Sequence, residues 1–123
     1  MDERIKQLEQ LKALADLMKS AKETKLAQAR SAEQAVQISL SDLRSTRQAE
    51  ITDPDAAQNA QALEGWLTWS RQRIGAEQAK QARHRAEVEM RLDDFKRAFG
   101  RSSAIDELLD RERHAQKQRR AKP

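Results

Sequence analysis

The proline at position 54 constrains the fold of this chain more than any other residue. Residues 1–53 contain no proline or glycine, and only Pro123 and the glycines at 65, 75 and 100 follow it as further helix breakers. Proline has no backbone N–H and disrupts the interior of an α-helix. The chain therefore divides into two helix-favouring arms, at about 2–51 and 54–99, which can fold back on each other as an antiparallel hairpin.

The residues around the break favour a turn near 52–53. Pro54 suits the first position of a helix, where its missing N–H costs nothing, and Thr52 or Asp53 can cap that helix. The alternative is one continuous helix that is kinked at Pro54. A proline inside a helix costs roughly 3 kcal/mol, so the turn is the favoured prediction.

The composition is typical of a coiled coil. Charged residues make up 36% of the chain, and alanine accounts for 20 of its 123 residues. Val, Ile and aromatic residues, which favour strands, are scarce. The predicted fold class is all-α, a long antiparallel two-helix coiled-coil hairpin with a short basic C-terminal extension.

The predicted core follows large apolar residues at spacings of three and four along each arm. It comprises Leu8, Leu11, Met18, Val36, Leu40, Leu43, Leu63, Leu67, Val88, Leu92, Phe95 and Phe99. The spacing slips between Met18 and Leu26, which predicts a stutter that unwinds the supercoil locally. A turn centred near residue 52 predicts partner numbers that sum to roughly 105. Residues 8–18 would then face 88–99, and residues 36–43 would face 63–69.

Gly100 can end the second arm, because glycine is common just after a helix. Ser103 and Asp106 then resemble a capping box that opens a short segment at 103–110. The alternative is a helix that continues through Gly100 at a cost of about 1 kcal/mol. The predicted domains are a hairpin at 1–110 and a basic tail at 111–123.

The basic tail carries the excess positive charge of the chain. It holds six basic residues against Glu112, so its net charge is 6 − 1 = +5, whereas the whole chain has +4. Its predicted partner-binding residues are Arg111, Arg113, Lys117, Arg119, Arg120 and Lys122. An acidic protein surface or nucleic acid could bind such a tail, and a purely solubilising end is the alternative. Because no aromatic residue interrupts the tail, single-stranded nucleic acid is the less favoured partner.

Trp66 and Trp69 form a second candidate for partner binding. The two lie three residues apart and can share one broad side of a helix. Leu63 and Leu67 supply the nearby seam, so at least one tryptophan is expected to project outward. Exposed tryptophan is frequent in interface hot spots. The alternative is that both pack across the hairpin close to the turn.

Nothing in the sequence predicts catalysis, a cofactor or a metal site. The chain has no cysteine, no phosphate-binding glycine loop and no G-x-S-x-G or H-E-x-x-H motif. His84 lies between two arginines, and Asp110 with His114 makes only two ligands. No apolar run approaches the ~20 residues of a membrane span, and residues 1–4 show no signal-peptide pattern. A non-enzymatic cytoplasmic protein with no small-molecule substrate is expected.

The stretch Ala98-Phe99-Gly100-Arg101-Ser102-Ser103-Ala104-Ile105-Asp106-Glu107-Leu108-Leu109-Asp110-Arg111-Glu112-Arg113 resembles the FliJ/YscO-like stalk proteins of bacterial flagellar and type III secretion export. The two arms, the central break and the basic end extend this resemblance over the whole chain. It implies a cytoplasmic helical hairpin that inserts into the hexameric export ATPase and contacts the export gate or export chaperones. The alternatives are a generic coiled-coil scaffold that self-associates and a nucleic-acid-associated coiled coil.

Overall fold

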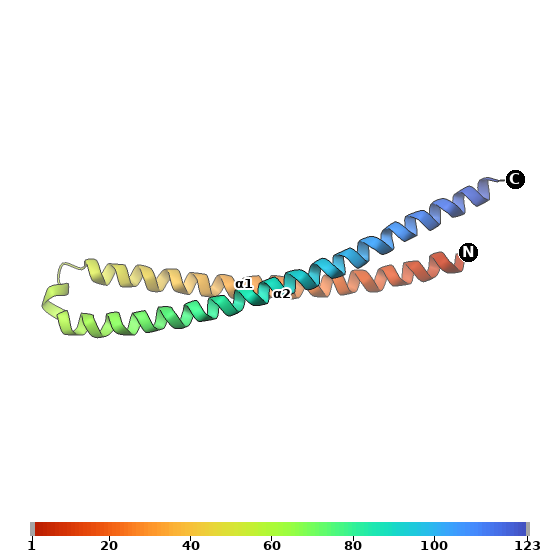
Figure 1. The fold of residues 1–123 in the computed structure, drawn as a ribbon. Coiled ribbons are helices and arrows are strands. Elements are labelled where there is room, and N and C mark those ends of the chain that lie inside the picture. The colour runs from red at the N-terminus through yellow and green to blue at the C-terminus, as the bar shows by residue number, and fades with distance from the viewer. Residues whose placement is uncertain (1, 123) are drawn as a thin grey trace. The chain divides into compact units, whose positions relative to one another are not determined.

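The structure, a computed structural model, describes residues 2–122 and consists of two α-helices joined by a short connection. Helix α1 spans Asp2–Thr52, the 3₁₀ helix η1 spans Ala56–Asn59, and α2 spans Ala60–Ala121 (Figure 1). The described residues contain no strand. The predicted all-α helical hairpin is therefore confirmed. Met1 and Pro123, at the ends of the predicted domains, lie outside the described residues.

The break at Pro54 is longer than the sequence predicted. Asp53 accepts a bond from the backbone N–H of Ala56 through its carbonyl oxygen at 3.1 Å, and from the N–H of Asp55 through Oδ1 at 3.0 Å. This is the chemistry of a β-turn with Asp at its first position and Pro at its second. Pro54 thus belongs to the turn and does not begin the second helix. Helix α2 begins at Ala60.

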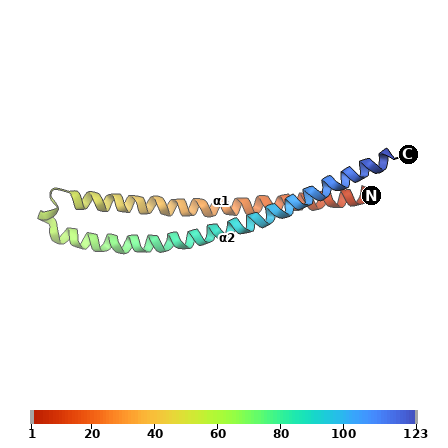
Figure 2. The ribbon, with the colours of Figure 1, turned by 45° about the horizontal axis from the view of Figure 1, so that its top comes forward.

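Two compact parts make up the chain. The turn unit is Gln28–Glu89, and the terminal unit combines Met1–Ala27 with Met90–Pro123. In the turn unit, the second half of α1 and the first part of α2 lie side by side and antiparallel (Figures 1 and 2). Leu40 is only 2% exposed there, and Arg85 Nε donates to Glu33 Oε1 across the helices at 3.2 Å.

The terminal unit packs the beginning of α1 against the end of α2. Its buried residues include Ala15 and Leu26 from α1, and Ala98, Ser102 and Leu109 from α2. Small residues at three of these five positions allow the two helix backbones to approach closely. Apolar burial along this narrow seam is the main stabilising contribution.

The seam of α1 follows an unbroken heptad pattern. The buried and half-buried positions include the series 5, 8, 12, 15, 19, 22, 26, 29, 33, 36, 40, 43 and 47, with spacings of three and four throughout. The predicted stutter between Met18 and Leu26 is therefore wrong. Three of the positions are lysines, 12, 19 and 22, whose aliphatic stems can cover apolar surface while the ammonium group stays in water. A search of the sequence for large apolar residues alone does not identify these lysines as seam positions.

Two predicted core residues of α1 lie outside this seam. Leu11 and Met18 are exposed, as are the neighbouring Leu14 and Leu17. The helical period places them one position before Lys12 and Lys19, on the flank of the seam. The predictions for Leu8, Val36, Leu40 and Leu43 agree with the observed seam.

Helix α2 also keeps one heptad phase. Its buried and half-buried series is 63, 67, 70, 74, 77, 81, 84, 88, 91, 95, 98, 102, 105, 109, 112 and 116. The series passes Gly100 without a change of phase, so the second arm does not end at 99. The predicted short segment and the tail up to Ala121 are parts of the same helix. Continuous burial on both sides of Gly100 outweighs the weak helix propensity of one glycine.

Phe99 is the third core prediction that the structure contradicts. Its side chain is exposed at a position next to the seam, with the Lys19 ammonium 5.5 Å from its ring centroid. Phe95, whose ring centroid lies 6.1 Å from that of Phe99, occupies the seam position itself. A cation above an aromatic face is attracted to the ring and stabilises Phe99 in this exposed position. Val88, Leu63 and Leu67 lie on the seam as predicted, and Leu92 is half-buried beside it.

The predicted pairing of the two arms is wrong by many residues. The prediction placed Glu33 opposite Gln72, but its partner in the turn unit is Arg85, 13 positions further along the chain. In the terminal unit, Lys12 contacts Ser102 and Asp106, where the prediction placed Asp93. Thirteen residues correspond to about 20 Å of helix. Part of the error arises because the second helix begins at Ala60, well beyond the predicted turn.

Candidate functional site

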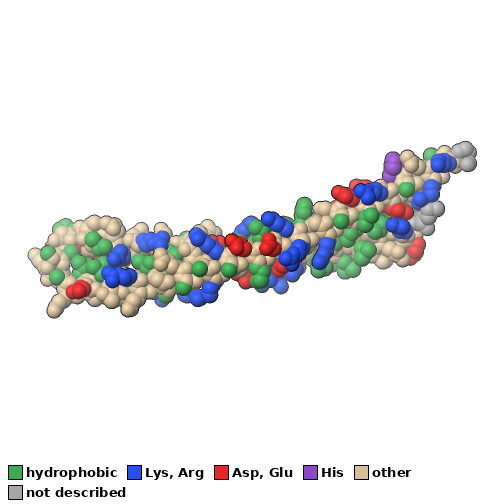
Figure 3. Space-filling view, viewed as in Figure 1, with side chains coloured by type: hydrophobic (Ala, Val, Ile, Leu, Met, Phe, Trp, Pro, Cys, Tyr) green, Lys and Arg blue, Asp and Glu red, His purple; other side chains and the backbone are tan. Residues whose placement is uncertain are grey.

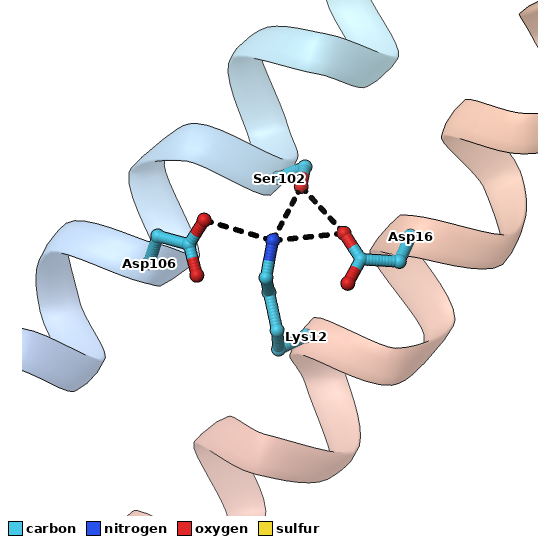
Figure 4. A network of polar contacts seen from close by, with 4 residues as sticks. All are labelled: Lys12, Asp16, Ser102 and Asp106. Carbon is cyan, nitrogen blue, oxygen red and sulfur yellow. Dashed lines mark hydrogen bonds and ion pairs between the residues drawn. The ribbon is translucent and has the colours of Figure 1, made fainter.

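A compact polar cluster joins the two helices of the terminal unit (Figure 4). The ammonium Nζ of Lys12 donates to Asp16 Oδ1 at 2.8 Å and to Ser102 Oγ at 2.8 Å, and it lies 2.9 Å from Asp106 Oδ2. Ser102 Oγ donates in turn to Asp16 Oδ1 at 2.7 Å. Lys12 and Asp16 come from α1, whereas Ser102 and Asp106 come from α2.

The charges of this cluster are mutually stabilised. The hydrogen bond to Asp16, followed by that to Asp106, raises the pKa of the Lys12 amine above its ordinary value. The hydrogen bonds from Lys12 and then from Ser102 lower the pKa of the Asp16 carboxyl. A lysine that is held protonated in this way is a poor proton acceptor. The cluster instead fixes which residues face each other across the seam, a role that polar core residues have in coiled coils.

The sequence contained a usable signal for this cluster. Once the heptad phase of α1 is set by Leu8, Ala15 and Leu26, Lys12 falls on a seam position. A charged residue on a seam requires partners, and Asp16 is one turn away. Ser102 and Asp106 could be added only when the length of the connection was known.

The tryptophans lie near the turn in different environments. Trp66 is half-buried and, together with Leu63 and Asn59, lines an open cavity of about 330 Å³ at the connection. Trp69 is 53% exposed. The structure thus places one tryptophan against the turn and one outward, as expected if at least one projects. Trp69 is the candidate anchor for a partner in the turn unit.

The predicted basic tail is an integral part of helix α2. Arg113 pairs with Glu9 at 3.1 Å, so part of its charge is neutralised within the terminal unit. Arg119 lies 3.8 Å from Glu112, which also lies 3.6 Å from Arg4. Arg120 lines a shallow pocket with Glu9, and the predicted residues Arg111, Lys117 and Lys122 are exposed. The helix therefore presents Arg111 and Lys117 at fixed positions, which a disordered tail does not, whereas Lys122 follows the end of α2.

The turn unit contains polar residues where a coiled coil usually has apolar ones. Glu77 is 4% exposed, with Lys80 at 3.2 Å and Arg73 at 3.5 Å, and the fully buried Ser70 donates to the carbonyl of Leu67. The Nε of Arg47 is buried, with no hydrogen-bond partner among the described residues. Buried charges and unsatisfied donors oppose folding. This seam is therefore weaker than its heptad pattern alone indicates.

The histidines and carboxylates do not form a metal site within residues 2–122. No group of three His, Asp or Glu side chains is arranged to hold an ion there. His84 is half-buried on the seam of α2, and His114 Nε2 lies 3.2 Å from Gln118 Nε2. Neither α1 nor α2 contains a stretch within the described part of the chain that is long and apolar enough to cross a membrane.

No family model, no curated protein and no solved structure matches this chain.

Proposed function

We propose that this chain is a non-enzymatic coiled-coil stalk or adaptor of a bacterial flagellar or type III export apparatus, and that it acts in the cytoplasm by engaging the export ATPase. The helical hairpin carries the proposal, because it is the architecture that the resemblance to FliJ/YscO-like stalks implies. Export-gate or chaperone proteins are the further partners of this proposal. No small-molecule substrate or cofactor is part of it.

Two surfaces support a role in protein binding. Trp69 in the turn unit exposes a large aromatic side chain, a residue type that dominates interface energies when it becomes buried. In the terminal unit, Arg111 and Lys117 are exposed on an ordered helix, where they can attract an acidic protein surface. Each surface can be altered without changing a seam residue.

The direct test is binding of the purified chain to the purified export ATPase of the same organism, measured by isothermal titration calorimetry. We expect Trp69→Ala to weaken binding about tenfold or more, as a hot-spot truncation does. The matched control is Ile38→Ala, which truncates an exposed apolar residue of the same unit. Arg111→Glu with Lys117→Glu should weaken binding and reduce its salt dependence.

Circular dichroism should show the same helicity for every variant. If the unaltered chain does not bind the ATPase at low salt, the proposed placement in an export apparatus is wrong. Binding that survives both sets of changes would instead remove Trp69 and the two cations from the functional surface.

A further inference from the structure

The terminal unit has an apolar groove beside the two-helix seam, and the seam residues Ala15, Ala98 and Ile105 also line it. Leu11, Leu14 and Met18 form its α1 side, and Ala98, Ala104 and Ile105 form its α2 side. The groove encloses about 430 Å³. In Figure 3, hydrophobic side chains gather over the part of the molecule that this unit forms. An exposed apolar surface of this kind often marks an interaction site.

The groove is an ordered second stripe beside the seam. Positions 11, 14 and 18 repeat at intervals of three and four, one step out of phase with seam positions 12, 15 and 19. On α2 the corresponding stripe contains 97, 101, 104, 108 and 111. A groove with an apolar stripe on one helix and a small residue, Ala104, on the other can hold a third helix, because Ala104 lets its backbone approach closely.

The charges along the groove are mostly positive. Arg101 lines the groove, and Arg97 and Arg111 share its stripe on α2. Lys25 continues the stripe of α1. The acidic residue on these stripes within the unit is Asp94, which lies 3.9 Å from Arg97. The rim therefore favours a partner that carries negative charge beside its apolar face.

We propose that this groove binds an amphipathic helix of another protein whose apolar face is flanked by acidic residues. The site is distinct from Trp69 and does not depend on the proposed export function. The positive rim disfavours a second copy of the chain at this face, because a twofold contact would bring the stripe of Arg97, Arg101 and Arg111 against the same positive stripe of the other copy. A concave groove that is partly lined by alanine fits a helix better than a flat bilayer surface.

The test uses a fluorescent synthetic helical peptide with leucines at spacings of three and four and glutamates at the flanking positions. Binding to the full chain is followed by fluorescence anisotropy at several salt concentrations. We expect Leu14→Ser to weaken binding about tenfold. The matched control Leu17→Ser changes a leucine of the same helix that is 68% exposed and does not line the groove, and it should bind as the unaltered chain does.

A charge exchange tests the rim. Arg101→Glu should weaken binding of the glutamate peptide and strengthen binding of a peptide in which lysines replace the glutamates. The control Lys96→Glu changes an exposed cation of the same helix that does not line the groove, and it should have a much smaller effect.

The proposal is overturned if the glutamate peptide does not bind, if both peptides bind equally, or if Leu17→Ser acts like Leu14→Ser. It is also overturned if sedimentation shows a dimer that Leu14→Ser dissociates, since the groove would then hold a second copy. Leu14-dependent binding to phosphatidylserine vesicles, with no binding of the peptide, would identify a membrane surface as the ligand.

Discussion

Leu26 and Leu14 provide a direct comparison between a seam residue and a groove residue of the same helix. Leu26 is 5% exposed, whereas Leu14 is 59% exposed. Truncation of each to alanine removes the same atoms and changes intrinsic helix propensity by the same small amount. Any difference between the two variants in the free energy of unfolding therefore reports burial.

The expected magnitudes follow from the exposed fractions. Leu→Ala removes three carbon atoms, each contributing about 0.8 kcal/mol when fully buried. For Leu26 this gives about 2.4 kcal/mol, and the cavity left in the seam increases the loss to about 3 kcal/mol. For Leu14 less than half of the side chain is buried, so the expected loss is below about 1 kcal/mol.

Urea unfolding followed by circular dichroism measures both losses. The measurement should be repeated over a range of protein concentrations, so that a contribution from self-association is detected. Leu17→Ala, at a more exposed position, should change the free energy of unfolding least. Equal losses for Leu26→Ala and Leu14→Ala would refute the seam described above and favour a core that includes the flank on which the predicted core residues Leu11 and Met18 lie.

Two further predictions concern the polar cluster around Lys12 and the glycine at position 100 of α2. The folded state lowers the pKa of Asp16, so the stabilisation from its charged form is complete above about pH 4 to 5 and is lost as the pH falls through the lowered value. Asp16→Asn should reduce the acid sensitivity of unfolding over that range; an unchanged pH profile would show that the cluster contributes nothing. Gly100→Ala should raise the free energy of unfolding by about 0.5–1 kcal/mol, because the position is helical and an added Cβ meets no atom within 4 Å. Destabilisation in urea would instead indicate that the helix ends at Gly100 in a glycine-specific conformation.

The helical character and the central break could be predicted from the sequence, because they depend on local chemistry. Pro54 and its acidic neighbours specify a turn, and the residues on either side favour helices. That at least one of Trp66 and Trp69 projects outward could also be anticipated, because Leu63 and Leu67 already occupy the seam positions beside them.

The heptad phase could have been predicted from the same residues but was missed. Leu11, Leu14 and Met18 are more hydrophobic than Lys12 and Lys19, so a search by hydrophobicity selects the groove in place of the seam. The strict spacing of Leu8, Ala15 and Leu26 identifies the seam only when small residues are given equal weight. The surplus of large apolar residues in α1 is the sequence signal for the groove.

The pairing register could not be derived from local patterns. It depends on where α2 begins, and the seven residues between Thr52 and Ala60 form a turn and a 3₁₀ helix that no strong sequence motif predicts. Each residue added to the connection shifts every cross-helix pair. The Lys12 cluster and the pair between Glu33 and Arg85 are therefore products of the register, and their partners could not be assigned beforehand.

Intrachain crosslinking tests the central claim, an antiparallel hairpin in this register, most directly. Cysteines are placed at Ala15 and Ser102, two buried seam positions of the terminal unit, or at the predicted but rejected pair Leu11 and Asp94. The Lys12 contacts with Ser102 and Asp106 fix the register that brings Ala15 and Ser102 to the same level. Under mild oxidation at low protein concentration, we expect a disulfide within one chain for Ala15→Cys with Ser102→Cys and none for the other pair. A disulfide that forms only between chains, or one that forms more readily with Leu11→Cys and Asp94→Cys, would contradict the account.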